Sequence, residues 1–157
     1  MSPVLADRGS WSLENCSIKN TLDLVGNKIS LLLLREAFLG TTRFDDFAER
    51  VEVSEPAAAR RLQELVDVGV FERTPYRPAG QRTRYEYHLT PKGRAFLPVM
   101  TALRDWGDDW ASGPAGPPLH AVHRECGEPI RAELRCRDGH RIGRGEIELR
   151  SGSAPRR

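Results

Sequence analysis

The fold of this chain is decided by residues 54–89, which read SEPAAARRLQELVDVGVFERTPYRPAGQRTRYEYHL. Ser54 and Pro56 are typical of a helix start, because serine is a preferred N-cap and proline fits the first helical turn. Apolar residues then recur at helical spacing, at Ala58, Leu62, Leu65 and Val66, until Gly69. We therefore expect a helix over Ser54–Asp67 that ends where the pattern changes.

The pattern after Gly69 predicts a β-hairpin. Strands are expected over Val70–Thr74 and Thr83–Leu89, and the second strand alternates polar with apolar residues. The loop Pro75–Gln81 between them contains two prolines and a glycine. Residues 73–84 carry four arginines and no acidic residue: Arg73, Arg77, Arg82 and Arg84. A helix followed by a basic hairpin favours a winged helix-turn-helix, with Ser54–Asp67 as recognition helix and Phe71–Leu89 as wing.

Three helices are expected before this stretch. The first runs from a Ser17 cap to about Val25, with Gly26 beyond its end. The second covers Asn27–Leu39 and is apolar on all sides at residues 31–34, which places it in the core. Gly40 supplies the left-handed residue that commonly ends a helix. A short third helix is expected to follow a Thr42 cap and to reach about Arg50.

One helix is expected after the wing. Thr90 and Pro91 fit the cap and the first helical position. Pro98 lies inside the pattern, so a kink or a late start is expected there. The apolar residues Phe96, Val99, Leu103, Trp106 and Trp110 are spaced by three and four, which is typical of a helix seam that packs on a partner.

These elements predict an α+β fold that is mostly α: a winged helix-turn-helix with a C-terminal dimerisation helix and a small β-rich tail. The expected organisation is a flexible arm over 1–15, the main domain over 16–110, a Pro/Gly-rich linker over 111–118 and a strand-rich tail over 119–157. Residues 151–157, SGSAPRR, are expected to be disordered.

Composition excludes several classes of protein. The chain of 157 residues is 39% hydrophobic and 29% charged, which suits one folded domain with a small appendage. No apolar run is long enough for a membrane span, and the N-terminus lacks the pattern of a secretory signal, so the expected location is cytoplasmic. Three cysteines make no disulfide framework. No catalytic triad, phosphate loop or paired-carboxylate motif stands out, so no enzyme activity is expected.

The predicted chemistry is contact with double-stranded DNA. A helix in the major groove presents polar side chains to base edges, and cationic side chains on a hairpin reach phosphates. Arginines on a surface are also commonly just solvated, and that alternative stays open here. The residues we expect at DNA are Arg43, Ser54, Glu55, Ala57, Arg60, Arg61, Arg77, Arg82 and Arg84.

Four pieces of the chain together resemble HxlR-type transcriptional regulators. They are LLREAFLGTTRFDDF, RLQELVDVGVFER, YEYHLTPKGRAFLPV and WGDDW, and the resemblance runs from Cys16 to Trp110. It implies a homodimer whose two winged helix-turn-helix units bind an inverted-repeat operator near a promoter. It also implies that the first and last helices make the dimer contact, with the seam Phe96, Val99, Leu103, Trp106 and Trp110 as the partner face.

Cys16 is a candidate redox sensor. The resemblance implies a cysteine near this position that senses oxidants or electrophiles in some family members. A place at a helix N-terminus would favour the reactive thiolate. The alternative is a buried cysteine that only fills space.

The tail contains a candidate metal site. His123, Cys126, Cys136 and His140 could supply two nitrogen and two sulfur ligands to zinc. Relatives with such an extension carry two cysteines in the second half, resembling a zinc ribbon, whereas this chain has Cys136-Arg137-Asp138-Gly139-His140. A metal-free hairpin is therefore the favoured interpretation, and no cofactor is expected.

The sequence thus predicts a dimeric, sequence-specific DNA-binding regulator, a repressor by default, that responds to a small molecule or a redox signal. The alternative is a winged-helix module that binds another protein and no specific DNA. A metal-sensing or accessory role would rest on the tail alone.

Overall fold

The structure is a computed structural model that describes residues 11–77, 80 and 82–152. The chain divides into two compact units, one formed by Ser17–Met100 and the other by Met1–Cys16 with Thr101–Arg157. The sequence placed the domain boundary in the linker 111–118, whereas the two units divide inside the last long helix. Most of the expected flexible arm, and residues 153–157 of the expected disordered end, lie outside the described residues.

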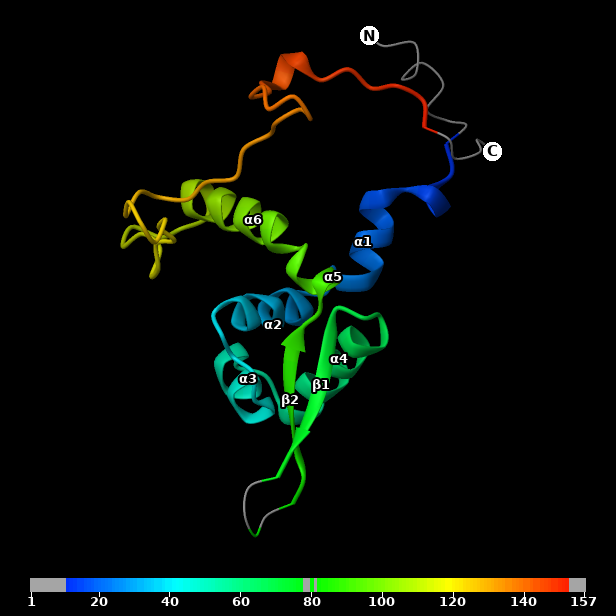
Figure 1. The fold of residues 1–157 in the computed structure, drawn as a ribbon, viewed down its shortest axis with the longest axis vertical. Coiled ribbons are helices and arrows are strands. Elements are labelled where there is room, and N and C mark those ends of the chain that lie inside the picture. Colours follow the sequence, from blue (N-terminus) through cyan, green and yellow to red (C-terminus); the bar gives the residue numbers. More distant parts are fainter. Residues whose placement is uncertain (1–10, 78–79, 81, 153–157) are drawn as a thin grey trace. The chain divides into compact units, whose positions relative to one another are not determined.

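The described chain is mostly helical, with one two-stranded sheet (Figure 1). In chain order the elements are η3 (Leu13–Asn15), α1 (Ser17–Val25), α2 (Lys28–Phe38), α3 (Phe44–Val51), α4 (Glu55–Asp67), β1 (Phe71–Tyr76), β2 (Arg84–Leu89), α5 (Pro91–Arg94), α6 (Leu97–Trp110) and η4 (Arg144–Glu146). This order confirms the predicted winged helix-turn-helix, in which α3 and α4 form the helical pair and β1–β2 the wing.

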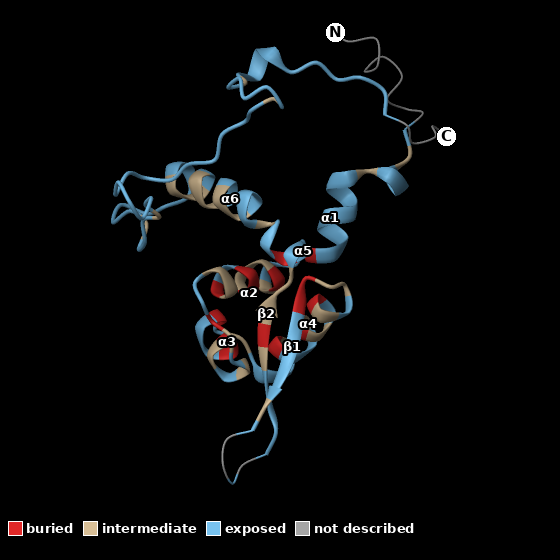
Figure 2. Cartoon of the chain, viewed as in Figure 1, coloured by how far each residue is buried: buried red, intermediate tan, exposed pale blue. Residues whose placement is uncertain are grey.

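The core of the Ser17–Met100 unit lies between α2, α3, α4 and the hairpin. Its largest fully buried side chains are Phe47, Phe71, Leu33, Leu34, Leu62 and Leu65. The rings of Phe71 and Tyr87 meet the Phe47 ring edge to face, with centroids 6.0 and 6.3 Å away. In Figure 2 the buried residues gather on these elements. Burial of this apolar surface is what holds α4 and the wing in fixed positions.

The helix boundaries depart from the sequence prediction at two caps. Cys16, and not Ser17, occupies the position before α1, since Ser17 is already helical. Arg43, and not Thr42, is the N-cap of α3. The Thr42 carbonyl instead accepts a hydrogen bond from the Tyr87 amide of β2, at 2.7 Å. Thr42, which the local pattern predicted as a helix cap, therefore bonds to the sheet instead.

Other boundary signals are confirmed. The Asn27 side chain accepts a hydrogen bond from the Ile29 amide and caps α2. Gly40 and Gly69 follow α2 and α4 with positive φ angles of 95° and 71°. The strands pair from Phe71↔Leu89 to Tyr76↔Arg84, so β1 begins one residue later and ends two residues later than the sequence predicted.

The expected last helix is interrupted. Thr90 caps α5 through the Gly93 amide, and α6 begins at Leu97, so Pro98 lies in its first turn and the late start is confirmed. Phe96 lies in the break and packs against the core of its own chain. Its carbonyl accepts hydrogen bonds from the Val99 and Met100 amides at the start of α6. The place of Phe96 in the partner-facing seam stays a prediction.

The tail is less regular than the sequence predicted. Over the described residues 119–152, the only bridges are Val122↔Pro129 and Arg135↔Arg141, in place of the expected strands. Backbone and side-chain bonds attach the tail to α6. The Arg104 guanidinium donates to the Ile130 carbonyl at 2.7 Å, and the Ala132 amide donates to the Asp105 carboxylate at 2.6 Å. Burial raises the pKa of Asp105, but the Ala132 amide and the Arg104 guanidinium outweigh that effect and lower the pKa overall.

Candidate DNA-binding surface

The N-terminus of α4 is exposed and lacks a side-chain cap. Ser54 is its N-cap residue, yet the Ser54 hydroxyl makes no capping hydrogen bond. Pro56 lies in the first turn, where its missing amide hydrogen costs nothing. The N-terminus of α3 also lacks a side-chain cap, because its N-cap residue Arg43 makes no capping hydrogen bond. Uncapped amides at a helix start attract anions such as phosphate.

Two adjacent arginines of α4 differ sharply in their surroundings. Arg60 is exposed and forms none of the ion pairs in the described part of the chain. Arg61 is half-buried, pairs with Glu64 at 2.5 Å and buries its Nε atom without a partner. The sequence treated the two as equivalent. The structure leaves Arg60 free to bind a ligand and holds Arg61 against its own helix, and Ala57 is half-buried in the same helix.

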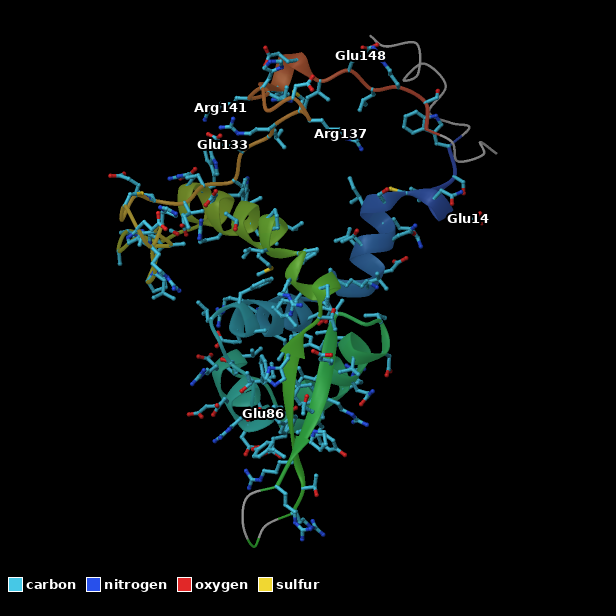
Figure 3. All side chains as sticks on the ribbon, in the orientation of Figure 1. Glu14, Glu86, Glu133, Arg137, Arg141 and Glu148 are labelled. Carbon is cyan, nitrogen blue, oxygen red and sulfur yellow. The ribbon has the colours of Figure 1, made fainter. Side chains whose placement is uncertain are left out.

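The wing holds its cations in place with aromatic rings and acids. The Arg84 guanidinium lies 2.9 Å from the Asp45 carboxylate of α3. Arg43 lies over the Tyr76 ring, 5.5 Å from its centroid, and 3.7 Å from Glu86, which Figure 3 labels on the hairpin. Arg82 and Arg77 are exposed. These contacts fix the direction of the side chains and leave much of each guanidinium in solvent.

Sequence reasoning missed Arg73 as a site residue. Arg73 lies over the Tyr85 ring at 4.8 Å and donates to the Gln63 side chain of α4 at 3.1 Å, so it links the wing to the helix. The register pairs Arg73 with Tyr87, which makes Tyr85 its diagonal neighbour. The strand register, once predicted, was the signal that could have identified this contact.

Helices α1 and α6 expose large apolar side chains. In α6 no residue is buried, and Val99, Leu103, Trp106 and Trp110 are 44%, 48%, 64% and 77% exposed. In α1 the same is true of Ile18 and Leu22. In Figure 2, α1 is coloured mainly as exposed, whereas α6 is a mixture of exposed and half-buried residues. Apolar surface of this kind is typical of a contact with another molecule.

The candidate metal ligands form two separate pairs. The Nδ1 atom of His123 lies 3.2 Å from the Cys126 sulfur, and that of His140 lies 3.5 Å from the Cys136 sulfur. Among the residues that the structure describes, no three His, Cys, Asp or Glu side chains come together as a metal site. In the same tail Glu133 pairs with Arg135 and Arg141, and Figure 3 shows Glu133 and Arg141 close together.

Comparison with known proteins agrees with this geometry. The model of the HxlR-like helix-turn-helix family matches residues 24–114, which cover α2 to α6. The chain belongs to this family. This HxlR-like protein is therefore a helix-turn-helix transcriptional regulator and not an enzyme. None of its described helices is both long and apolar enough to cross a membrane.

Its relatives are regulators of the same type. An uncharacterized HTH-type transcriptional regulator of Mycobacterium bovis is 39% identical over 127 residues, 81% of this chain and 79% of the relative. YdeP of Bacillus subtilis is 31% identical over 105 residues, 66% of this chain and 80% of the relative. 

Solved structures share the fold. The transcription-factor candidate PA1607 superposes with a TM-score of 0.77 at 32% identity, over 89% of this chain and 97% of its own. The redox regulator HypR in its reduced form has a TM-score of 0.53 at 27% identity, over 59% and 90%.

Proposed function

We propose that this HxlR-like regulator acts as a homodimer that binds an inverted-repeat operator and represses transcription by occupying the promoter. The observation that carries the proposal is Arg60, an exposed and unpaired cation on α4. It lies within two turns of the uncapped helix start at Ser54. Together they offer a charged fork for a base edge and backbone amides for a phosphate, which is what a recognition helix needs.

The mechanism follows from these parts. In each subunit α4 enters the major groove with Ser54, Glu55, Ala57 and Arg60 toward DNA. The wing arginines Arg77, Arg82 and Arg84, with Arg43 at α3, contact phosphates and release counterions. Arg61 is predicted to approach DNA only if its bond to Glu64 opens. A dimer places two such helices about 34 Å apart, one turn of the double helix.

The dimer contact is assigned to the exposed apolar side chains of α1 and α6. Val99, Leu103, Trp106 and Trp110 form the α6 part of this face. Tryptophan is enriched at the buried centre of protein interfaces, where it contributes a large apolar area. The two-fold symmetry of such a dimer matches an inverted repeat, because each half-site then meets the same surface.

A DNA titration tests the proposal. We expect the full chain to bind a selected operator with an affinity that falls steeply as salt rises, because several phosphates lose counterions. Arg60→Ala should weaken binding and relax base preference at one position, by about 1–3 kcal/mol for a bidentate base contact. Arg124→Ala, an exposed arginine of the tail, is the matched control.

Two outcomes would contradict this. A selection on random DNA that enriches no sequence would favour the protein-interaction module instead. An Arg60→Ala variant with unchanged affinity and base preference would remove Arg60 from the interface, while leaving DNA binding by the other residues intact.

Redox control is proposed through Cys16. Its half-buried thiol lies at the junction between η3 and α1, next to the helix assigned to the dimer contact. HypR, which shares the fold, is a redox regulator. Mild oxidation of the thiol with hydrogen peroxide should lower the affinity for the operator several-fold, and Cys16→Ser should remove the response. A Cys16→Ser protein that still loses DNA on oxidation would contradict this assignment.

A further inference from the structure

A pocket within the Ser17–Met100 unit lies between the end of α2, strand β2 and the α5–α6 break. Its volume is about 380 Å³. That is near the lower end of the range, roughly 300–1,000 Å³, in which proteins bind small molecules. The residues of the DNA-binding surface described above are not among those that line it. The pocket therefore needs an explanation of its own.

The walls are apolar on two sides. Ala37 and Phe38 come from the last turn of α2, while Leu89 and Leu97 come from the end of β2 and the start of α6. Leu97 remains half-exposed, so a bound apolar group would cover it. An apolar ligand body that fits here gains from leaving water.

The polar lining is basic. Arg94 and His88 both line the pocket, and no acidic side chain of the described chain does. The Arg94 guanidinium donates to the Leu89 carbonyl, which holds it beside β2 and leaves its other N–H groups available. The Thr42 hydroxyl, also in the lining, makes no hydrogen bond with other described residues. Arg94, His88 and Thr42 thus add polar groups to a largely apolar lining, and the His88 Nε2 atom lies 3.5 Å from the Glu86 carboxylate, which is not part of the lining.

We propose that this pocket binds a small organic carboxylate with an apolar body, and that this ligand is the effector of the regulator. A carboxylate matches the planar fork of Arg94, and the apolar body matches Phe38, Leu89 and Leu97. The binding site stands on the pocket alone, while the effector role rests on the proposed function.

The position of the pocket explains how its ligand acts on DNA binding. The lining joins β2, whose partner strand carries Arg73 beside α4, to Leu97, the first residue of the helix assigned to the dimer contact. Residues 95 and 96 between α5 and α6 form the break where that helix changes direction. A ligand that contacts both walls favours one angle between α5 and α6. It shifts the affinity for DNA only if this angle differs from that of the ligand-free protein and thereby changes the spacing of the recognition helices.

The first experiment measures binding without DNA. Full-length ¹⁵N-labelled protein is titrated with phenylacetate and isovalerate, and with the neutral phenylacetamide. We expect saturable shifts at the amides of Thr41, Thr42, His88 and Leu89, and about tenfold or more weaker binding of the amide, because it lacks the charge that Arg94 binds. If neither carboxylate shifts these amides at millimolar concentration, the proposal is overturned.

Variants locate the ligand. Arg94→Met should weaken carboxylate binding to the level of phenylacetamide, and Ala37→Leu should weaken both by filling the cavity. Thr42→Val keeps the shape of the side chain and should weaken carboxylate binding several-fold. It tests the site even where the larger changes disturb folding. Arg124→Met in the tail is the control and should bind as the wild type does. Binding that survives all three pocket variants would place the ligand elsewhere and overturn the site.

The second experiment adds the selected operator. We expect saturating phenylacetate to change operator affinity at least several-fold, and Arg94→Met to remove that change while leaving affinity without ligand unaltered. Ligand binding with no effect on operator affinity would overturn the effector role. Ligand binding in a protein that binds no DNA would overturn the proposed function and leave the carboxylate site standing, so the two failures are distinguishable.

Discussion

At the residue scale, Gly93 shows how a single side chain can be incompatible with this fold. Gly93 is buried, and a Cβ atom built there would collide with the Val70 carbonyl oxygen. The same carbonyl accepts hydrogen bonds from the amide and hydroxyl of Thr90, so it cannot move without breaking the cap of α5. The sequence predicted a helix start at Thr90 and Pro91, but no local pattern indicated that Gly93 would lie against the Val70 carbonyl, just before β1.

Gly93→Ala is therefore expected to destabilise the protein by about 1–3 kcal/mol, the usual cost of an overpacked core. Urea unfolding measures this as a lower midpoint with an unchanged slope. Gly113→Ala is the control, since nothing lies within 4 Å of a Cβ atom there, and it should change stability by less than about 0.5 kcal/mol. Equal stability of the two variants would show that the Val70 carbonyl can move away from Gly93 at little cost.

At the element scale, α4 and α6 show what the sequence could predict and what it could not. The bounds of α4 were predicted to within one residue, because Ser54, Pro56 and Gly69 are local signals. The different surroundings of Arg60 and Arg61 were not predicted, because they depend on which side of α4 packs against its neighbours. In α6 the apolar spacing identified side chains that the structure leaves exposed, whereas Phe96, directly before α6, packs partly against the core, which the spacing did not indicate.

The Asp105 carboxylate makes the attachment of the tail to α6 dependent on pH, because it accepts a hydrogen bond from the Ala132 amide. Its pKa is lowered in the folded state, so the charged form stabilises the attached tail above the ordinary pKa of an aspartate, and this stabilisation is lost as pH falls through the folded pKa. We expect the hydrogen-exchange protection of the Ala132 amide, which donates to Asp105, to be constant near neutral pH and to fall below about pH 4.

Asp105→Ala should remove this protection at neutral pH, with a loss of about 1–3 kcal/mol for a hydrogen bond to a charged group. The control is Asp138→Ala, an exposed aspartate elsewhere in the tail. If Ala132 remained protected in Asp105→Ala, the tail would be held on α6 mainly by the Arg104–Ile130 and Arg131–Asp109 contacts.

At the scale of the whole molecule, the winged unit was predictable and the tail was not. The winged unit combines strong periodicity with Gly and Pro signals at nearly every boundary. Residues 119–152 have short, polar periods, so the predicted strands reduce to two bridged turns. Each turn holds one of the His–Cys pairs, and the sequence spacing alone could not show that the four side chains divide two and two.

The dimer is the prediction that depends on the whole molecule, because both α1 and α6 leave large apolar side chains exposed in the described chain. Trp106→Glu places a charge in the centre of the α6 face, where a desolvated carboxylate has no cation to pair with. We expect the wild type to sediment as a dimer and Trp106→Glu as a monomer. The variant should bind a full inverted repeat no better than a half-site, a loss of roughly 10²–10⁴ in affinity because the second contact is no longer tethered to the first. Leu39→Glu, at an exposed leucine outside α1 and α6, is the control and should remain dimeric. A dimeric Trp106→Glu with full operator affinity would move the interface away from α6, and the exposed tryptophans would then need another partner.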